Sequence, residues 1–394
     1  MAGQGETRGM FLGNSDMVDL VDLRHRLHRR PEISGEERET AATIVAFLEP
    51  TGPDRILTGL GGHGVAAVYE GAEPGPTVLL RCELDALPIE EISTSDHRSE
   101  VPGKGHLCGH DGHMAIIAGL ARGLARNRPR RGRAVLLFQP AEETGAGAAA
   151  VIADPHFAEI APDYAFSLHN RPGVPVGHAR ISEGPANCAS RGLRIVLTGE
   201  TSHASTPHHA RSPAPAIAEL IPALSALGPG GEIGADFRLV TVTHVAVGEP
   251  AFGITPGHGE LWATLRTLDD AQMGALCEAA EALAREAAGR GRLDVAMSYH
   301  DVFHHCENDA EAVAMLRRAM DEEGVPHGPA KPSRGSEDFG LFGRKAKAAM
   351  FLLGSGDTAH LHNPDYDFPD DAIAPGARVL MRALRNLLGE AARS

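Results

Sequence analysis

The pattern of apolar and polar positions changes along this chain and predicts two kinds of structure. In the first half, short continuous apolar runs alternate with segments of helical periodicity. Strands without a polar face are typical of a sheet covered by helices on both faces. We therefore expect an α/β fold, with a mixed, mainly parallel sheet sandwiched by helices. The expected strands are 65–69, 77–82, 134–138 and 163–167, and the expected helices are 19–28, 35–48, 113–126 and 146–153.

A capping box is predicted at the start of the second helix. Ser34 stands three residues before Glu37. At this spacing a serine and a glutamate can each satisfy a free backbone N–H group of the first helical turn. We therefore expect that helix to begin close to Gly35.

A different order of elements begins near Ala186. It comprises a strand at 192–198, a helix at 213–227, strands at 237–247 and 259–267, a helix at 270–288 and a strand at 292–303. This βαββαβ order is typical of a ferredoxin-like unit. The α/β pattern then returns, with a helix at 310–322, a strand at 348–353 and a helix at 375–388. We expect residues 186–303 to be an inserted domain, and residues 1–185 and 304–394 to be two parts of one domain.

The composition excludes several classes of binding partner and indicates where the protein acts. The formal net charge of −15 argues against binding to nucleic acid or to an anionic membrane surface. No stretch approaches the roughly 20 apolar residues that span a bilayer, and the N-terminus does not resemble a secretion signal. The five cysteines are scattered and do not resemble a disulfide framework. We therefore expect a cytoplasmic protein whose cysteines are open to metal binding or catalysis.

Candidate metal ligands occur in five segments, most of them just beyond an apolar strand. These segments are 79–85, 106–113, 139–143, 169–170 and 360–364. In open α/β sheets, loops from several strands converge outside the carboxyl ends of the strands. We therefore expect these segments to meet in one site.

The residue types in these segments suit a divalent metal. Cysteine, histidine and carboxylate are the standard ligands of zinc, and a mixed set is typical of a catalytic site. The adjacent Glu142 and Glu143 allow one carboxylate to bind metal while the other deprotonates the attacking water. Taken singly, His106, His113 and His360 are better explained as loop or capping residues. Cys108 alone could equally be a buried small residue, or a nucleophile with His110 as its base.

The motifs, in order, resemble those of the di-metal amidohydrolases and peptidases. This family includes hippurate hydrolases, N-acyl-amino-acid deacylases and auxin-conjugate hydrolases. The resemblance spans nearly the full length, and CGHDGH and QPAEE are its most specific segments. The motifs are LRHRLHRRPE at 23–32, LDALP at 84–88, CGHDGH at 108–113, FQPAEE at 138–143, LHN at 168–170, HASTPH at 203–208, SEDF at 336–339 and HNP at 362–364.

The resemblance implies metal-dependent hydrolysis of an N-acyl amino acid or a similar small amide, releasing a carboxylic acid and an amine. It implies Glu142 as general base, Asp85 as a carboxylate that orients a ligand, and His203 as a stabiliser of the oxyanion. It further implies that the inserted domain is a lid and a dimerisation domain, that the protein is a homodimer, and that His203 comes from the partner subunit. The cofactors would be two divalent metal ions, zinc or else manganese, cobalt or nickel. The implied metal ligands are Cys108, His110, Glu143, His169 and His362.

Five positions depart from the family pattern. Glu83 stands where aspartate is common, Ser202 and Thr144 replace glycines, Gly253 replaces an asparagine, and Arg171 replaces a tryptophan. None removes an implied ligand or the base, so hydrolysis is still expected. The loss of the asparagine changes the lid side of the substrate site. Arg171 leads to the hypothesis that the substrate carries an anionic or polar group, against the alternative that Arg171 is a solvated loop residue.

Other functions remain open from the sequence. The same site could cleave a dipeptide or release an amino group from an aromatic ring. A relative that only binds metal is disfavoured, because a structural site needs no free carboxylate beside Glu143. A cysteine-nucleophile enzyme would be distinguished by its resistance to chelation.

Overall fold

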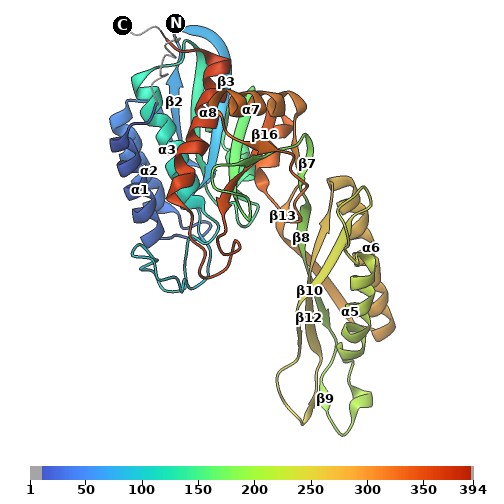
Figure 1. The fold of residues 1–394 in the computed structure, drawn as a ribbon. Coiled ribbons are helices and arrows are strands. Elements are labelled where there is room, and N and C mark those ends of the chain that lie inside the picture. Colours follow the sequence, from blue (N-terminus) through green and yellow to red (C-terminus); the bar gives the residue numbers. More distant parts are fainter. Residues whose placement is uncertain (1–10, 392–394) are drawn as a thin grey trace, which may run out of the picture.

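The structure is a computed structural model, and it describes residues 11–391. Its larger part is built on one eight-stranded sheet with the order β1-β2-β4-β3-β5-β16-β6-β15 (Figure 1). The middle strands β4, β3, β5 and β16 run parallel, whereas β1 and β2 at one edge run antiparallel. The strands are β1 Arg55–Leu60, β2 Gly64–Glu70, β3 Glu73–Glu83, β4 Arg131–Gln139, β5 Tyr164–Pro172, β6 Ala179–Arg180, β15 His327–Gly328 and β16 Lys347–Gly356.

Both faces of this sheet are covered by helices, because alternate side chains of each strand enter different cores. In β2, Val65, Ala67 and Tyr69 belong to one core, and Ala66 and Val68 belong to the other. The predicted mixed sheet sandwiched by helices is therefore confirmed. The first core is closed by α1 Asn14–Arg29, α2 Arg38–Leu48, α3 His110–Arg126, α7 Ala310–Glu323 and α8 Ile373–Leu388, and the second by α4 Gly147–Ala153 and the 3-10 helices Pro155–Glu159 and Asp338–Arg344.

The predicted capping box at the start of α2 is wrong. The helix begins at Arg38, and its capping residue is Glu37. The Ser34 hydroxyl instead donates a hydrogen bond of 2.7 Å to the Asp85 carboxylate. A tertiary contact thus takes the side chain that the local pattern assigned to the helix end.

A second, antiparallel sheet of four strands extends away from the first part of the molecule (Figure 1). Its strand order is β10-β12-β8-β13, and α5 and α6 bury one face of it in a separate apolar core. The elements occur in the expected order: β8 Ala189–Thr198, α5 Ala214–Leu227, β10 Arg238–Val247, β12 His258–Thr267, α6 Asp270–Gly291 and β13 Asp294–Phe303. Its boundaries as a domain, and its role as a lid and dimerisation domain, stay predictions.

Short elements complete the fold. β9 lies at the far tip of the second sheet in Figure 1, where it pairs with β11. None of the helices within residues 11–391 is both long and apolar enough to cross a membrane. The short elements are β7 Gly184–Asn187, β9 Ser202–His203, β11 Ile254–Thr255, β14 Cys306–Asn308 and the 3-10 helices Glu49–Thr51, Pro207–His209 and Asp370–Ala372.

Candidate active site

The carboxyl ends of the parallel strands surround a cavity of about 420 Å³. β4 leads into the turn that carries Glu142 and Glu143, β5 carries His169, and β16 is followed by the loop with His362. The residues reach this cavity because parallel strands end at the same edge of the sheet. Its lining includes Cys108, Glu142, Glu143, His169, Arg171, Glu337 and His362.

The structure brings all five expected metal ligands together with Glu142. Cys108 Sγ lies 3.5 Å from His169 Nε2, and His362 Nε2 lies 3.5 Å from Glu143 Oε2. Three overlapping groups each place their ligand atoms within 4.8 Å of one another, which is close enough to share an ion. These groups are Cys108, His110 and His169; Cys108, Glu143 and His362; and His110, Glu142 and Glu143.

A tight turn delivers Cys108 and His110 to the same cavity. Gly109, between them, has a φ of 91°, a left-handed conformation that favours glycine. A Cβ at this position would also lie only 2.8 Å from the Asn170 side chain. α3 begins directly afterwards at His110. The glycine is therefore required both by the backbone conformation and by the close packing against β5.

Hydrogen bonds fix the orientation of two of the imidazoles. His110 Nδ1 donates to the backbone carbonyl of Asp85 at 2.8 Å, and His169 Nδ1 donates to the carbonyl of Asn170 at 2.9 Å. Each ring therefore presents Nε2 to the cavity. Within residues 11–391, the buried atoms His110 Nε2 and Glu143 Oε1 have no hydrogen-bond partner. Buried polar atoms without partners are rare, and a divalent metal would satisfy both of these.

Asp85 lies behind the ligands and is fully buried. Its Oδ2 accepts hydrogen bonds from the Ser34 hydroxyl at 2.7 Å and from the Glu143 backbone N–H at 3.0 Å. Its other carboxylate oxygen, Oδ1, is 3.7 Å from His110 Nδ1. The side chain therefore fixes the backbone of one candidate ligand and faces the ring of another.

The ionisable groups of the cavity are strongly perturbed. Burial, with the charges of Glu337 and Glu143, raises the pKa of Glu142 well above its usual range. Burial and the charges of Glu143 and Glu142 likewise raise the pKa of the Cys108 thiol. Burial alone would lower the pKa of His110, but its contacts with Asp85 and nearby carboxylates raise it to about 10. Nearby negative charge contributes to all three shifts, and a bound cation would offset that charge.

A buried charge network supports the cavity, and the sequence pattern does not predict it. Arg81 forms ion pairs with Glu83, with Glu337 at 3.0 Å and with Asp338 at 2.6 Å. His113, expected to be a loop or capping residue, is buried and bonds to Glu83 at 2.7 Å. Glu337 and Asp338 lie in the SEDF motif, and Glu83 ends an apolar strand. The motif and the strand end are the features of the sequence that could have indicated this network.

His203 is not part of this cluster in the chain. It lies in β9, at the far tip of the second sheet in Figure 1, and its side chain is exposed. Gly253 lies beside it, with its carbonyl accepting from the Ala204 N–H at 3.0 Å. His106 is buried with neither ring nitrogen bonded within residues 11–391, and His360 is exposed.

Comparison with known proteins identifies the family of this chain. The family model described as peptidase family M20/M25/M40 matches residues 79–386, which is more than half of the chain. The chain belongs to this family. The match includes every residue of the candidate cluster.

Two curated relatives match over most of their length. The chain is 29% identical to an N-acetylcysteine deacetylase of Bacillus subtilis, covering 90% of this chain and 93% of that protein. It is 29% identical to an IAA-amino acid hydrolase of Arabidopsis thaliana, covering 94% and 85%. Among solved structures, a Bacillus subtilis protein described as a dinuclear metal binding peptidase of the M20 family superposes with a TM-score of 0.80. It is 27% identical, covering 95% of this chain and 99% of that one.

Proposed function

We propose that this member of the M20/M25/M40 family is a metal-dependent amidohydrolase. It cleaves the amide bond of an N-acyl amino acid or a similar small amide and releases a carboxylic acid and an amine. One observation carries the proposal: Cys108, Glu142, Glu143, His169 and His362 line one cavity with His110 clustered against them, and within residues 11–391 the buried ligand atoms His110 Nε2 and Glu143 Oε1 have no partner. The relatives named as a deacetylase and an amino acid hydrolase support the same chemistry.

Two divalent metal ions are the cofactors, held by Cys108, His110, Glu143, His169 and His362. Bound there, they would polarise the amide carbonyl and lower the pKa of the attacking water. A thiolate among the ligands suits zinc, while the histidines and carboxylates also suit manganese, cobalt or nickel. The neighbouring protein described as dinuclear supports the number of ions.

Glu142 moves the proton. It takes a proton from the water that attacks the carbonyl carbon, and it then delivers that proton to the departing amine as the C–N bond breaks. Its position supports this role, because Glu142 Oε2 lies 4.0 Å from His110 Nε2, next to the ligands. Asp85 takes no proton and orients His110 and Glu143.

The first experiment measures metal content per chain and amine release from a panel of N-acyl amino acids, before and after chelation. We expect close to two metals and chelator-sensitive release. Glu142→Gln should lower kcat by about 10²- to 10⁴-fold with metal content unchanged, whereas Glu143→Gln should lose metal. Full activity in Glu142→Gln, or a metal-free enzyme that survives chelation, would contradict the proposal.

The protein further acts as a cytoplasmic homodimer through the second sheet, which also serves as the lid. The exposed apolar residues Val245, Phe252, Ile254 and Trp262 lie on the second sheet or at its tip and support the dimer interface. The five free cysteines support the cytoplasmic location. In a dimer, His203 of one chain would stabilise the oxyanion in the other.

Light scattering tests the dimer, and subunit mixing tests His203. Glu142→Gln and His203→Ala should each be inactive alone. A mixture should regain activity, because its heterodimers combine an intact Glu142 with an intact His203 of the partner chain. Two inactive proteins that stay inactive when mixed and re-equilibrated would rule out the shared site.

A further inference from the structure

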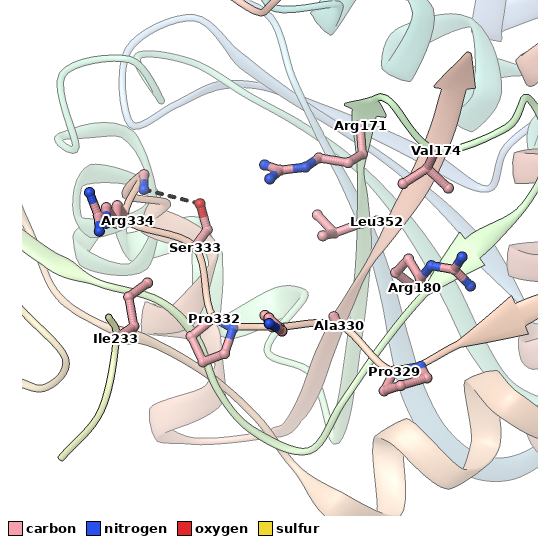
Figure 2. Close-up of a pocket in the computed structure, with 12 residues that line it drawn as sticks. Arg171, Val174, Arg180, Ile233, Pro329, Ala330, Pro332, Ser333, Arg334 and Leu352 are labelled. Atoms are coloured by element: carbon pink, nitrogen blue, oxygen red, sulfur yellow. Dashed lines mark hydrogen bonds between the residues drawn. The ribbon is translucent and has the colours of Figure 1, made fainter. Parts of the chain in front are cut away.

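A second cavity of about 570 Å³ adjoins the candidate active site (Figure 2). The two cavities share Arg171, Ser333, Gly335 and Leu352 in their walls. A substrate whose amide lies beside the candidate ligands can therefore extend into this second space, which we call the basic pocket.

The basic pocket is lined by four basic side chains and, within residues 11–391, by no acidic one. The four are Arg171, Arg180, Lys331 and Arg334. Arg334 donates to the backbone carbonyl of Gly231, and in the described part of the chain none of the four is paired with a carboxylate. The chain as a whole carries a net charge of −15. Cations without counterions converging on one cavity raise its potential and favour an anionic ligand.

The pocket is built on the same strands as the candidate ligands. Across three neighbouring strands, His169 of β5 pairs with Leu352 of β16, and Leu352 pairs with Arg180 of β6. Residues that pair across a sheet share a face, so the three side chains form one row. Strands are spaced by about 4.8 Å, which places the backbone of Arg180 about 10 Å from that of His169.

Arg171 extends this row along β5. It stands two residues after His169, and side chains two apart on a strand lie on the same face. In Figure 2 its guanidinium reaches into the space facing Ser333, with Arg334 and Arg180 at opposite ends of the pocket. The planar guanidinium presents paired N–H donors that match the two oxygens of a carboxylate. Arg171 is therefore the residue best placed to bind an anion close to the scissile amide.

We propose that the basic pocket binds a second carboxylate of the substrate. The enzyme then prefers N-acyl amino acids that carry an extra negative charge, either in the amino acid side chain or at the far end of the acyl group. The inference rests on the proposed amide hydrolysis and names its substrate class.

Matched substrate pairs test the preference. One pair is N-acetyl-glutamate and N-acetyl-glutamine, and the other is N-succinyl-alanine and N-butanoyl-alanine. We expect a higher kcat/KM for the doubly charged member of at least one pair. The pair that shows the difference identifies whether the amino acid side chain or the acyl group enters the basic pocket. Arg171→Gln should lower kcat/KM for that substrate by about 10- to 100-fold, as expected for a lost charge-assisted hydrogen bond, and should lower kcat/KM for its singly charged partner much less.

Three controls separate charge from structure. Arg171→Lys should restore part of the preference, because it keeps the charge without the planar fork. Lys331→Gln should weaken the preference less than Arg171→Gln. Arg98→Gln removes a charge from an exposed residue outside both cavities and should change nothing.

Calorimetric binding of glutarate and butanoate to the metal-loaded enzyme gives a readout that needs no turnover. Glutarate should bind more tightly, and Arg171→Gln should abolish the difference. If the enzyme hydrolyses the substrates but prefers neither doubly charged one, the basic pocket inference is wrong and the proposed function stands. If no substrate is hydrolysed but glutarate binds more tightly in a way that depends on Arg171, the inference is supported and the proposed function is wrong. If neither hydrolysis nor a glutarate preference is seen, the inference and the proposed function are both wrong.

Discussion

Replacing Asp85 with asparagine tests whether a buried carboxylate prepares the metal ligands without binding metal itself. The substitution keeps the size of the side chain and removes its charge. In the structure, Asp85 Oδ2 accepts two hydrogen bonds, from the Ser34 hydroxyl and the Glu143 N–H. A hydrogen bond to a charged group contributes about 1 kcal/mol more than one to a neutral group, so two of them amount to about 2 kcal/mol. If this energy holds Glu143 and His110 in place, metal affinity should fall about 30-fold.

The assay is competition for metal with a chelator of known affinity, supported by circular dichroism to confirm the fold. Ser34→Ala is the matched control, because it removes one of the two hydrogen bonds and keeps the charge. It should lower metal affinity by less than about 10-fold. A folded Asp85→Asn protein with unchanged metal affinity would refute the reasoning, since the orienting contacts would then contribute nothing to binding.

Three further predictions concern stability. Gly109→Ala should destabilise the fold by about 1–3 kcal/mol in urea unfolding, because the added Cβ would collide with the Asn170 side chain. Gly274→Ala is the control: its Cβ would lie in open space on α6, and it should stabilise the fold by about 0.4–1 kcal/mol. Arg81→Met should cost about 3–5 kcal/mol, measured the same way, because it leaves buried carboxylates unpaired. Burial alone would lower the pKa of His28, but its contacts with Asp111 and Glu91 raise it to about 10 from 6.5. The stability lost in His28→Gln should therefore be largest below pH 6.5 and shrink as pH rises to 10, and a pH-independent difference would contradict this.

The sheet and its helices could be predicted because their signals are local. Continuous apolar runs such as 134–138 mark strands buried on both faces, and the Gly-rich segment 108–113 marks a turn that gathers ligands. Polar side chains at strand ends could be expected to converge for a topological reason alone. The expected cluster of Cys108, His110 and Glu143 is present in the structure for that reason.

Tertiary partners could not be predicted in the same way. The local pattern around Ser34 predicts a capping box, yet its hydroxyl donates to the Asp85 carboxylate, 51 residues away. His113 was expected to be a loop or capping residue because nothing near it in sequence announces Glu83, 30 residues before it. Arg180 and His169 come from different strands, and only the sheet register shows that they share a face.

The two adjoining cavities carry opposite charge. Near the candidate ligands the buried acids Glu83, Glu142, Glu337 and Asp338 lie around the buried guanidinium of Arg81. Burying such an excess of one sign is costly, and divalent cations at the ligand atoms would offset it. At the other end of the substrate space the charge is positive, and within residues 11–391 no acidic side chain lines the basic pocket. A substrate carboxylate is therefore attracted to the basic side chains of the basic pocket. The neutral amide then faces the metal ligands. The electrostatic potential of the two cavities therefore orients the substrate before Glu142 takes its proton.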